Sequence, residues 1–151
     1  MRAFKSMLRW CVACGALLLA VACDRQEQLN REMRENLTTG YWQAGTDDSQ
    51  LVRFTTSGEV FYFRCAPVAG SSSIDACYDA AAQPHTGYAV DFLNNTLCLL
   101  PDDWFNILHL TEDALTLQAD GGEPVFYVKV SASRVTVLTE EEFLEKHPAE
   151  S

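Results

Sequence analysis

The chain has 151 residues, of which 48% are hydrophobic and 21% charged. This composition is typical of one globular domain and excludes disordered and collagen-like classes. The 21 acidic residues outnumber the 11 basic ones and give a formal net charge of −10 at pH 7. That balance argues against nucleic acid as a partner, because phosphate binding depends on clustered lysine and arginine.

Residues 1–22 have the pattern of a removable bacterial export signal. Three basic residues, Arg2, Lys5 and Arg9, precede the uncharged apolar run over residues 10–22. This run is too short to cross a hydrocarbon core, which needs about 20 helical residues. We therefore interpret residues 1–22 as a signal peptide rather than as a membrane span.

The apolar run ends in Leu19-Ala20-Val21-Ala22-Cys23. This stretch resembles a lipobox, the small-residue segment before a cysteine that is lipidated and becomes the new N-terminus. We expect Cys23 to carry the lipid and to anchor the protein durably, since several acyl chains bind a membrane far more firmly than one. The expected location is the bacterial cell envelope, with the domain facing the periplasm or the exterior.

The residue after the lipobox bears on which membrane holds the anchor. Asp24 follows Cys23 directly, and the enterobacterial sorting rule for lipoproteins implies retention on the inner membrane. Other bacteria sort lipoproteins differently, so the sequence leaves inner and outer membrane open.

Helices are expected at both ends of the mature chain. Leu29, Met33 and Leu37 are spaced four apart in a polar segment, which places them along one face of a helix over residues 24–37. At the other end, Thr139-Glu140-Glu141-Glu142 has the Thr-x-x-Glu form of a capping box. It predicts a short helix that ends near His147.

The segment between these helices has the pattern of about nine short strands with mostly brief connections. Ser57-Gly58 and Asn94-Asn95 are turn pairs. This pattern is typical of an antiparallel meander that closes into a barrel or forms a sandwich. Residues 66–85 interrupt it, and the alanines of residues 74–82 favour one or two helical turns there.

Several short motifs in this segment resemble lipocalin-like domains. Leu37-Thr38-Thr39-Gly40-Tyr41-Trp42 is similar to their Gly-x-Trp opening, in which the tryptophan plugs the barrel bottom. The hairpin over residues 51–63 resembles the next strand pair. Residues 104–118 are similar to the W-x-I-x-x-L-T-x-D-x-L-T-L hairpin of small bacterial lipocalin-like lipoproteins, and residues 126–130 resemble their closing strand.

The resemblance covers most of residues 37–130 and implies an all-β fold, an antiparallel up-and-down barrel with a short N-terminal and a short C-terminal helix. An open β-sandwich is the alternative. The expected organisation is a signal peptide (1–22), a lipidated tether with a short helix (23–38), a lipocalin-like barrel (39–140) and a C-terminal helical tail (141–151).

Four cysteines remain after removal of residues 1–22. An exported chain meets an oxidising compartment, where disulfides form and persist. Cys65 ends a predicted strand and Cys77 lies in the following insert, so we expect these two to pair and to hold residues 66–85 against one rim. We expect Cys98 to stay reduced and buried, as a small hydrophobe.

The three histidines give no indication of a metal site. His85, His109 and His147 lie far apart, and none belongs to a His-x-x-x-His spacing. By strand alternation, His109 should share a half-buried face with Phe105 and Ile107. We expect no metal and no cofactor.

Catalytic patterns are equally absent from the sequence. There is no Gly-x-Ser-x-Gly nucleophile motif. The acidic pairs Asp47-Asp48 and Asp102-Asp103 could serve acid–base chemistry or calcium binding. Solvated turns at strand ends are the commoner use of such pairs. We therefore predict a protein that is not an enzyme.

Two function classes fit these observations. The first is a binding module that holds a small apolar or amphipathic ligand in the barrel, with residues 66–85 as a lid; the sequence does not name the ligand-binding residues. The second is a structural or interaction protein with a filled barrel, whose acidic surface docks an envelope protein. Its partners would then be the membrane, through the anchor, and that protein.

Overall fold

In the computed structural model, residues 21–148 are described, and the chain divides into two compact units, Met1–Glu32 and Met33–Ser151. The described part of the first unit is helical, and the side-chain amide of Gln26 donates to Asn30 Oδ1 at 3.0 Å. The second unit begins with helical residues 33–38. The expected helix over residues 24–37 is therefore observed. The predicted signal peptide lies outside the described residues for all but its last two positions.

Cys23, the expected lipidation site, has an exposed side chain. No helix among the described residues is long and apolar enough to span a membrane.

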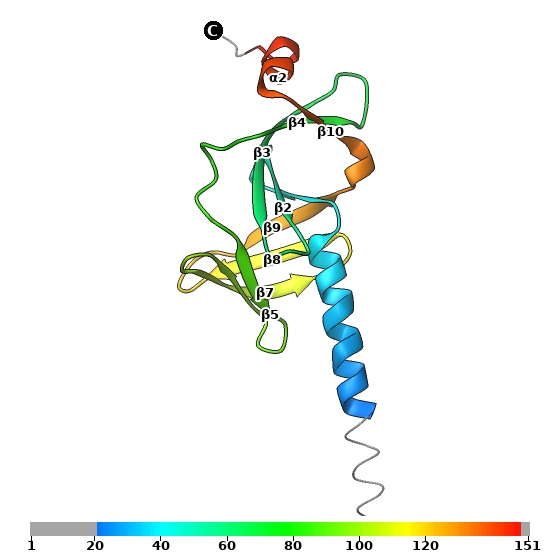
Figure 1. Cartoon of the computed structure of the whole chain (residues 1–151), viewed down its shortest axis with the longest axis vertical. Coiled ribbons are helices and arrows are strands. Elements are labelled where there is room, and N and C mark those ends of the chain that lie inside the picture. The colour runs from blue at the N-terminus through cyan, green and yellow to red at the C-terminus, as the bar shows by residue number, and fades with distance from the viewer. Residues whose placement is uncertain (1–20, 149–151) are drawn as a thin grey trace, which may run out of the picture. The chain divides into compact units, whose positions relative to one another are not determined.

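The second unit is mostly β-structure (Figure 1). Its ten strands form one sheet. The strands are β1 (Tyr41–Ala44), β2 (Asp47–Phe54), β3 (Val60–Pro67), β4 (Ile74–Tyr78), β5 (Tyr88–Asp91), β6 (Thr96–Leu99), β7 (Asp103–Leu110), β8 (Ala114–Ala119), β9 (Val125–Val130) and β10 (Val135–Leu138). A 3₁₀ turn, η1 (Ala132–Arg134), precedes β10, and the helix α2 (Glu140–Lys146) follows it.

The strand order is β10-β4-β3-β2-β1-β9-β8-β7-β6-β5. Neighbouring strands are antiparallel except for β10, which pairs parallel to β4. β1 pairs antiparallel with β9, with Tyr41 opposite Val130. Within the described residues the edge strands β10 and β5 do not pair, so the sheet is open between them. Residues 79–87 connect β4 to β5.

The segment after β3 corrects one expectation. Residues 74–78 form β4, not helical turns, and β3 extends to Pro67, so residues 66–85 are not a separate lid. The register places Ile74 opposite Pro67 and Asp75 opposite Ala66, and β10 pairs with the other side of β4. Pairing on both sides of a strand that is buried from Ile74 to Cys77 outweighs the helix preference of its alanine.

The sheet carries an apolar cluster on each face. The inner cluster gathers side chains of β1 to β3 and of β5 to β8 together with the end of the N-terminal helix: Leu37, Trp42, Val52, Phe54, Val60, Tyr62, Tyr88, Phe92, Leu97, Leu99, Ile107, Leu115 and Leu117. The outer cluster covers the opposite face of β1 to β4 and β9: Tyr41, Leu51, Phe63, Cys65, Ile74, Ala76 and Val130. Period-two alternation along each strand divides the apolar residues between these faces.

Trp42 joins the helical residues to the sheet within the second unit. Its fully buried indole Nε1 donates to Leu37 O at 2.9 Å. Lys129 of β9 lies over the indole, with Nζ 4.6 Å from the ring centroid, and donates to Asn36 O at 2.5 Å. Gly40 has φ +73°, and a Cβ there would lie 2.8 Å from Val130 O. Only glycine fits that close approach.

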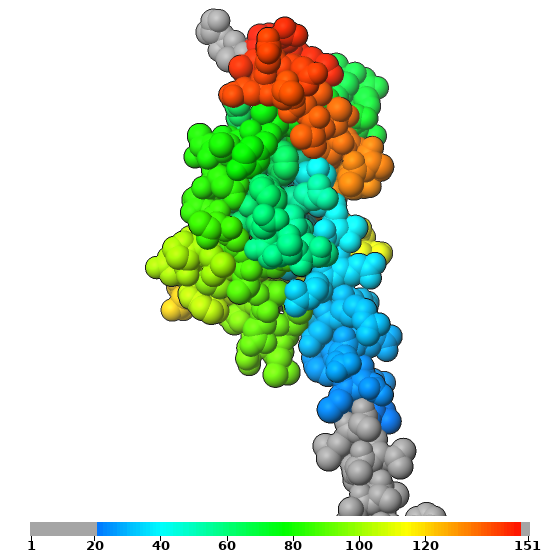
Figure 2. All heavy atoms as spheres, viewed as in Figure 1, coloured from blue at the N-terminus to red at the C-terminus, as the bar shows by residue number. Residues whose placement is uncertain are grey.

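The C-terminal helix is capped as the sequence predicts. The Thr139 hydroxyl accepts from Glu142 N, and the Glu142 carboxylate accepts from Thr139 N. Phe143 is the buried residue of α2. Figure 2 shows the C-terminal residues in red, packed against the green part of the chain that includes β4.

Candidate binding groove

The register of β2, β3 and β4 gathers aromatic side chains on the outer face of the sheet. Arg53 lies opposite Phe61, and Leu51 lies opposite Phe63. Phe63 in turn lies opposite Tyr78 of β4. Because strand residues two apart point to the same face, these side chains share one surface.

This surface is hollowed into a groove of about 550 Å³ lined by Arg53, Thr55, Phe61, Phe63 and Tyr78. A second hollow, of about 350 Å³, shares Phe61 and Tyr78 with the first. Its other lining residues come from the start of β3 and from the connection to β5: Glu59, Val60, Gln83, Pro84, His85 and Thr86. We call the two hollows together the aromatic groove.

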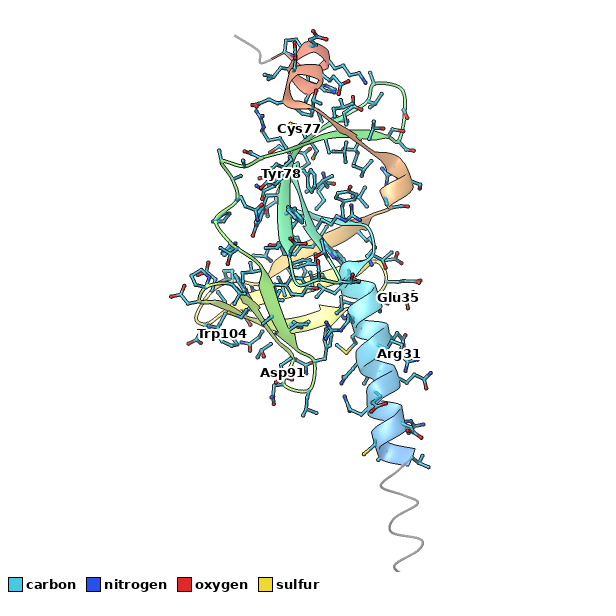
Figure 3. All side chains as sticks on the ribbon, viewed as in Figure 1. Arg31, Glu35, Cys77, Tyr78, Asp91 and Trp104 are labelled. Carbon is cyan, nitrogen blue, oxygen red and sulfur yellow. The ribbon has the colours of Figure 1, made fainter. Side chains whose placement is uncertain are left out.

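Edge-to-face contacts fix the floor of the aromatic groove. The ring centroids of Phe61 and Tyr78 are 5.9 Å apart, and those of Phe63 and Tyr78 are 6.1 Å apart. Phe63 also contacts Tyr41, at 5.5 Å. Tyr78 is 44% exposed although Phe63 beneath it is buried. Figure 3 labels Tyr78 beside Cys77 on β4, and it places Trp104 on a different part of the sheet.

Arg53 supplies the positive charge of the aromatic groove. Its guanidinium carbon lies 5.3 Å from the Tyr41 ring centroid, and Nη1 donates to the Tyr41 hydroxyl at 3.3 Å. Among residues 21–148, the carboxylates within 4 Å of a basic side chain contact Arg64, His85, Lys146 and His147, and none contacts Arg53. The Arg53 guanidinium is therefore oriented by an aromatic ring without a compensating anion.

Packed side chains fill the inner face of the sheet. The thirteen buried residues of the inner cluster, including Trp42, Phe54 and Tyr62, pack against one another there. Side chains of this size fill the interior of a small β-structure. The open aromatic surface is on the outer face.

A hydrogen-bonded chain of three residues joins β3 to β7 through the connection between β4 and β5. The Tyr62 hydroxyl lies 2.7 Å from His85 Nδ1, and His85 Nε2 lies 2.5 Å from Asp103 Oδ2. Burial raises the pKa of Tyr62 to about 12. At neutral pH this tyrosine is therefore protonated and acts as a hydrogen-bond donor, not as a nucleophile.

Gln83 strengthens the same junction with its side chain. Its Nε2 donates to Val60 O and, at 2.9 Å, to His85 O, and its Oε1 accepts from Tyr62 N at 3.2 Å. Beside it, Tyr88 N donates to Gly58 O at 2.9 Å. Side-chain and loop hydrogen bonds thus join the connection between β4 and β5 to β3 and to the turn before it.

The structure does not form the expected disulfide. Cys65 and Cys77 are both free and buried. Cys65 lies opposite Ala76 and Cys77 opposite Arg64, so the two side chains point to opposite faces of the sheet and cannot meet without backbone movement. Cys98 is free and buried.

The Cys65 thiol takes part in the turn between β1 and β2. It donates to Asp48 O at 3.2 Å, and burial raises its pKa to about 11. A thiol in this state is a poor nucleophile. It serves packing instead of chemistry.

A β-bulge corrects the expected position of His109. Ile107 lies opposite Leu117, but His109 lies opposite Thr116, with a register shift between them. Leu117 and Thr116 are consecutive and face opposite sides, so His109 is exposed on the outer face while Ile107 is buried. An extra residue in one strand changes the side to which later residues point, and strand alternation alone does not reveal it.

The other candidate residues have separate roles. The Asp47 carboxylate accepts from the Ser49 amide and hydroxyl, which lowers its pKa, as expected of a solvated turn. Asp103 contacts His85, and His147 Nε2 lies 2.9 Å from the buried Asp75. These His–Asp pairs join residues distant in sequence.

No group of three or more His, Cys, Asp or Glu side chains in the described part of the chain is arranged to hold a metal ion.

Period-two alternation places Phe61, Phe63 and Cys65 on one face of a strand, but it does not identify the aromatic groove. The signal for part of it was present in the hairpin, where Arg53 and Thr55 alternate with Phe54. Tyr78 completes the groove only because residues 74–78 form a strand beside β3.

Comparison of the chain with family models, curated proteins and solved structures gives no match.

Proposed function

We propose that this chain is a non-enzymatic binding protein, anchored to a bacterial envelope membrane by a lipid on Cys23, and that its aromatic groove holds a small apolar or amphipathic ligand. The observation that carries this proposal is the hollow of about 550 Å³ whose lining includes Phe61, Phe63 and Tyr78. Sites of this size lined by aromatic side chains and a few polar groups are typical of small-ligand binding. The ligand lies outside the sheet because the inner cluster occupies the inner face.

The anchor and the fold are parts of the same proposal. The lipobox resemblance ending at Cys23 supports the lipid and the envelope location, facing the periplasm or the exterior. The pairing of β1 with β9 and the position of buried Trp42 at one end of the inner cluster support a lipocalin-like meander. In this view the barrel is open between its edge strands β10 and β5, and Gln83 and His85 lie on the connection between β4 and β5.

The groove proposal is tested by native mass spectrometry of protein purified from cells, with two matched variants. Tyr78→Ser removes an exposed ring from the groove, and Trp104→Ser removes an exposed ring, 63% accessible, from β7. We expect a co-purified apolar ligand on the wild type and on Trp104→Ser, and loss of it on Tyr78→Ser. Equal retention on both variants would contradict the groove.

A second function has its own supporting observation. The filled inner face and the excess of acidic residues favour an interaction protein that docks an envelope partner through its acidic surface. In the same experiment, a ligand-free wild type that retains one protein partner, and loses it at high salt, would favour this alternative. Metabolic labelling with a palmitate analogue tests the anchor separately, because equal labelling of Cys23→Ala would refute it.

A further inference from the structure

We propose that the aromatic groove selects an organic anion with a linear apolar chain, whose head group pairs with Arg53 while the chain lies across Phe61 and Tyr78. This inference rests on the proposed function, since it names the class of ligand for the same groove.

The first step is the state of the Arg53 side chain. Tyr41 fixes it from below through the ring contact and the 3.3 Å hydrogen bond, so only part of its fork of donors is used. A guanidinium has five N–H donors and matches carboxylate geometry in a bidentate manner. Arg53 is exposed at the groove and lacks a carboxylate within 4 Å among residues 21–148.

The second step is the contrast with the other basic residues of the second unit. Arg64 contacts Asp79 and Glu140, and Lys146 contacts Asp75. Lys129 and Arg134 donate to the backbone carbonyls of Asn36 and Ser72. Arg34 lies over the Phe92 ring, 5.8 Å from its centroid, but does not line the aromatic groove. Arg53 combines an aromatic support with a position in the aromatic groove.

The third step is the polarity of the groove along its length. Arg53 lies opposite Phe61 in the first hollow. The second hollow is lined by Glu59 and by His85, whose Nε2 already contacts the Asp103 carboxylate. The rings of Phe61 and Tyr78 border both hollows. An anion placed at Arg53 has an apolar path over these rings, and the reverse orientation would bring its charge toward the Glu59 carboxylate. The groove therefore favours one orientation of a chain with a single anionic end.

The surrounding charge makes this selection local. The chain has a formal net charge of −10, so its general field repels anions and attracts cations. Preference for an anion can then come only from the groove itself. Loss of the Arg53 charge should therefore change the preference for an anion more clearly than loss of one basic residue would in a basic protein.

The experiment uses full-length protein in nanodiscs of zwitterionic lipid and two photoreactive probes. The probes are dodecanoic acid and dodecanol with a diazirine at the same carbon, at a pH where the acid is ionised. The readout is the ratio of acid to alcohol crosslinked to the protein. Arg53→Gln removes the charge, Arg53→Lys keeps it without the planar fork, and Arg134→Gln is the matched control outside the groove.

We expect the wild type and Arg134→Gln to prefer the acid. Arg53→Gln should lower the acid-to-alcohol ratio by about fivefold, the scale of one partly exposed ion pair, while its labelling by the alcohol stays unchanged. The acid-to-alcohol ratio of Arg53→Lys should lie between those of the wild type and Arg53→Gln. A wild type labelled equally by both probes, or an unchanged ratio in Arg53→Gln, would overturn the anion selection and leave the groove standing. Absence of labelling by both probes would overturn the proposed function as well.

Discussion

His85 bridges two strands that are not neighbours in the sheet: its Nδ1 lies 2.7 Å from the hydroxyl of Tyr62 on β3, and its Nε2 lies 2.5 Å from Asp103 on β7. His85 itself lies on the connection between β4 and β5. A buried hydroxyl without its partner is costly, at about 1 to 3 kcal/mol. The three residues therefore connect β3 to β7 through their side chains, and we call this chain of hydrogen bonds the clasp.

A double-mutant cycle measures this clasp. His85→Ala should lower the free energy of unfolding by about 2 kcal/mol and Tyr62→Phe by about 1 kcal/mol. The double variant should lose less than the sum, because each change removes the same hydrogen bond. Urea unfolding followed by tryptophan fluorescence supplies the values. His109→Ala, at an exposed position, is the control: its loss of unfolding free energy should add fully to that of Tyr62→Phe. Full additivity between His85→Ala and Tyr62→Phe would refute the clasp.

Stability should fall at alkaline pH. Burial raises the pKa of Tyr62 to about 12 and that of Cys65 to about 11, above their ordinary values of 10.0 and 9.0. Both groups thus stabilise the fold below their ordinary pKa, and this stabilisation is lost as the pH rises through the folded values. The free energy of unfolding should decline from about pH 9 to pH 12.

Variants separate the contributions of Tyr62 and Cys65 to this decline, to which Tyr88 and Tyr127 also contribute because burial raises the pKa of both. Cys65→Ala should flatten the part that begins near pH 9, and Tyr62→Phe should make the part above pH 10 shallower without abolishing it. Tyr78→Phe, at an exposed tyrosine, is the matched control. Unfolding curves at a series of pH values provide the test, and a Tyr62→Phe profile that superimposes on the wild type would contradict the assignment.

The C-terminal helix should depend on a buried carboxylate. Asp75 is buried, and it accepts from His147 at 2.9 Å with Lys146 at 3.8 Å. His147→Ala leaves the carboxylate with the more distant, exposed partner, so we expect a loss of about 1 to 2 kcal/mol in docking of α2. Hydrogen exchange should accelerate over residues 140–147 and not in β7 or β8. Glu145→Ala, on the exposed side of α2, should leave exchange unchanged.

The thiols should be protected by burial instead of by a disulfide. Cys65, Cys77 and Cys98 are all free and buried. We expect each to resist alkylation in the folded protein and to react fully after unfolding without reductant. Peptide mapping under non-reducing conditions that found Cys65 linked to Cys77 would contradict the register of β3 and β4.

The sequence predicts best those elements whose signal is local. The Gly58 turn and the Thr139–Glu142 capping box depend on neighbouring residues, and both are found in the structure. Residues 74–78 become a strand because β3 and β10 pair with them on both sides. The short stretch of sequence around residues 74–78, with its alanines and serines, does not contain the information that β3 and β10 pair with it.

The candidate groove shows the same limit. Alternation in the hairpin predicts that Phe61 and Phe63 share a face, but not that Tyr78 lies beside Phe63 or that Tyr41 supports Arg53. Those contacts join strands separated by loops of unpredictable path. The bulge before His109 and the His–Asp pairs likewise depend on register, which a single sequence specifies only weakly.

The central claim is that the ligand lies on the outer face of β2, β3 and β4. Mapping the crosslinked residues of photoreactive dodecanoic acid on the full-length protein in nanodiscs, by peptide mass spectrometry, tests it most directly. The account predicts adducts on Phe61, Phe63 and Tyr78. Adducts on Trp42 and Phe54, which face the inner cluster, would contradict it and place the ligand inside the sheet.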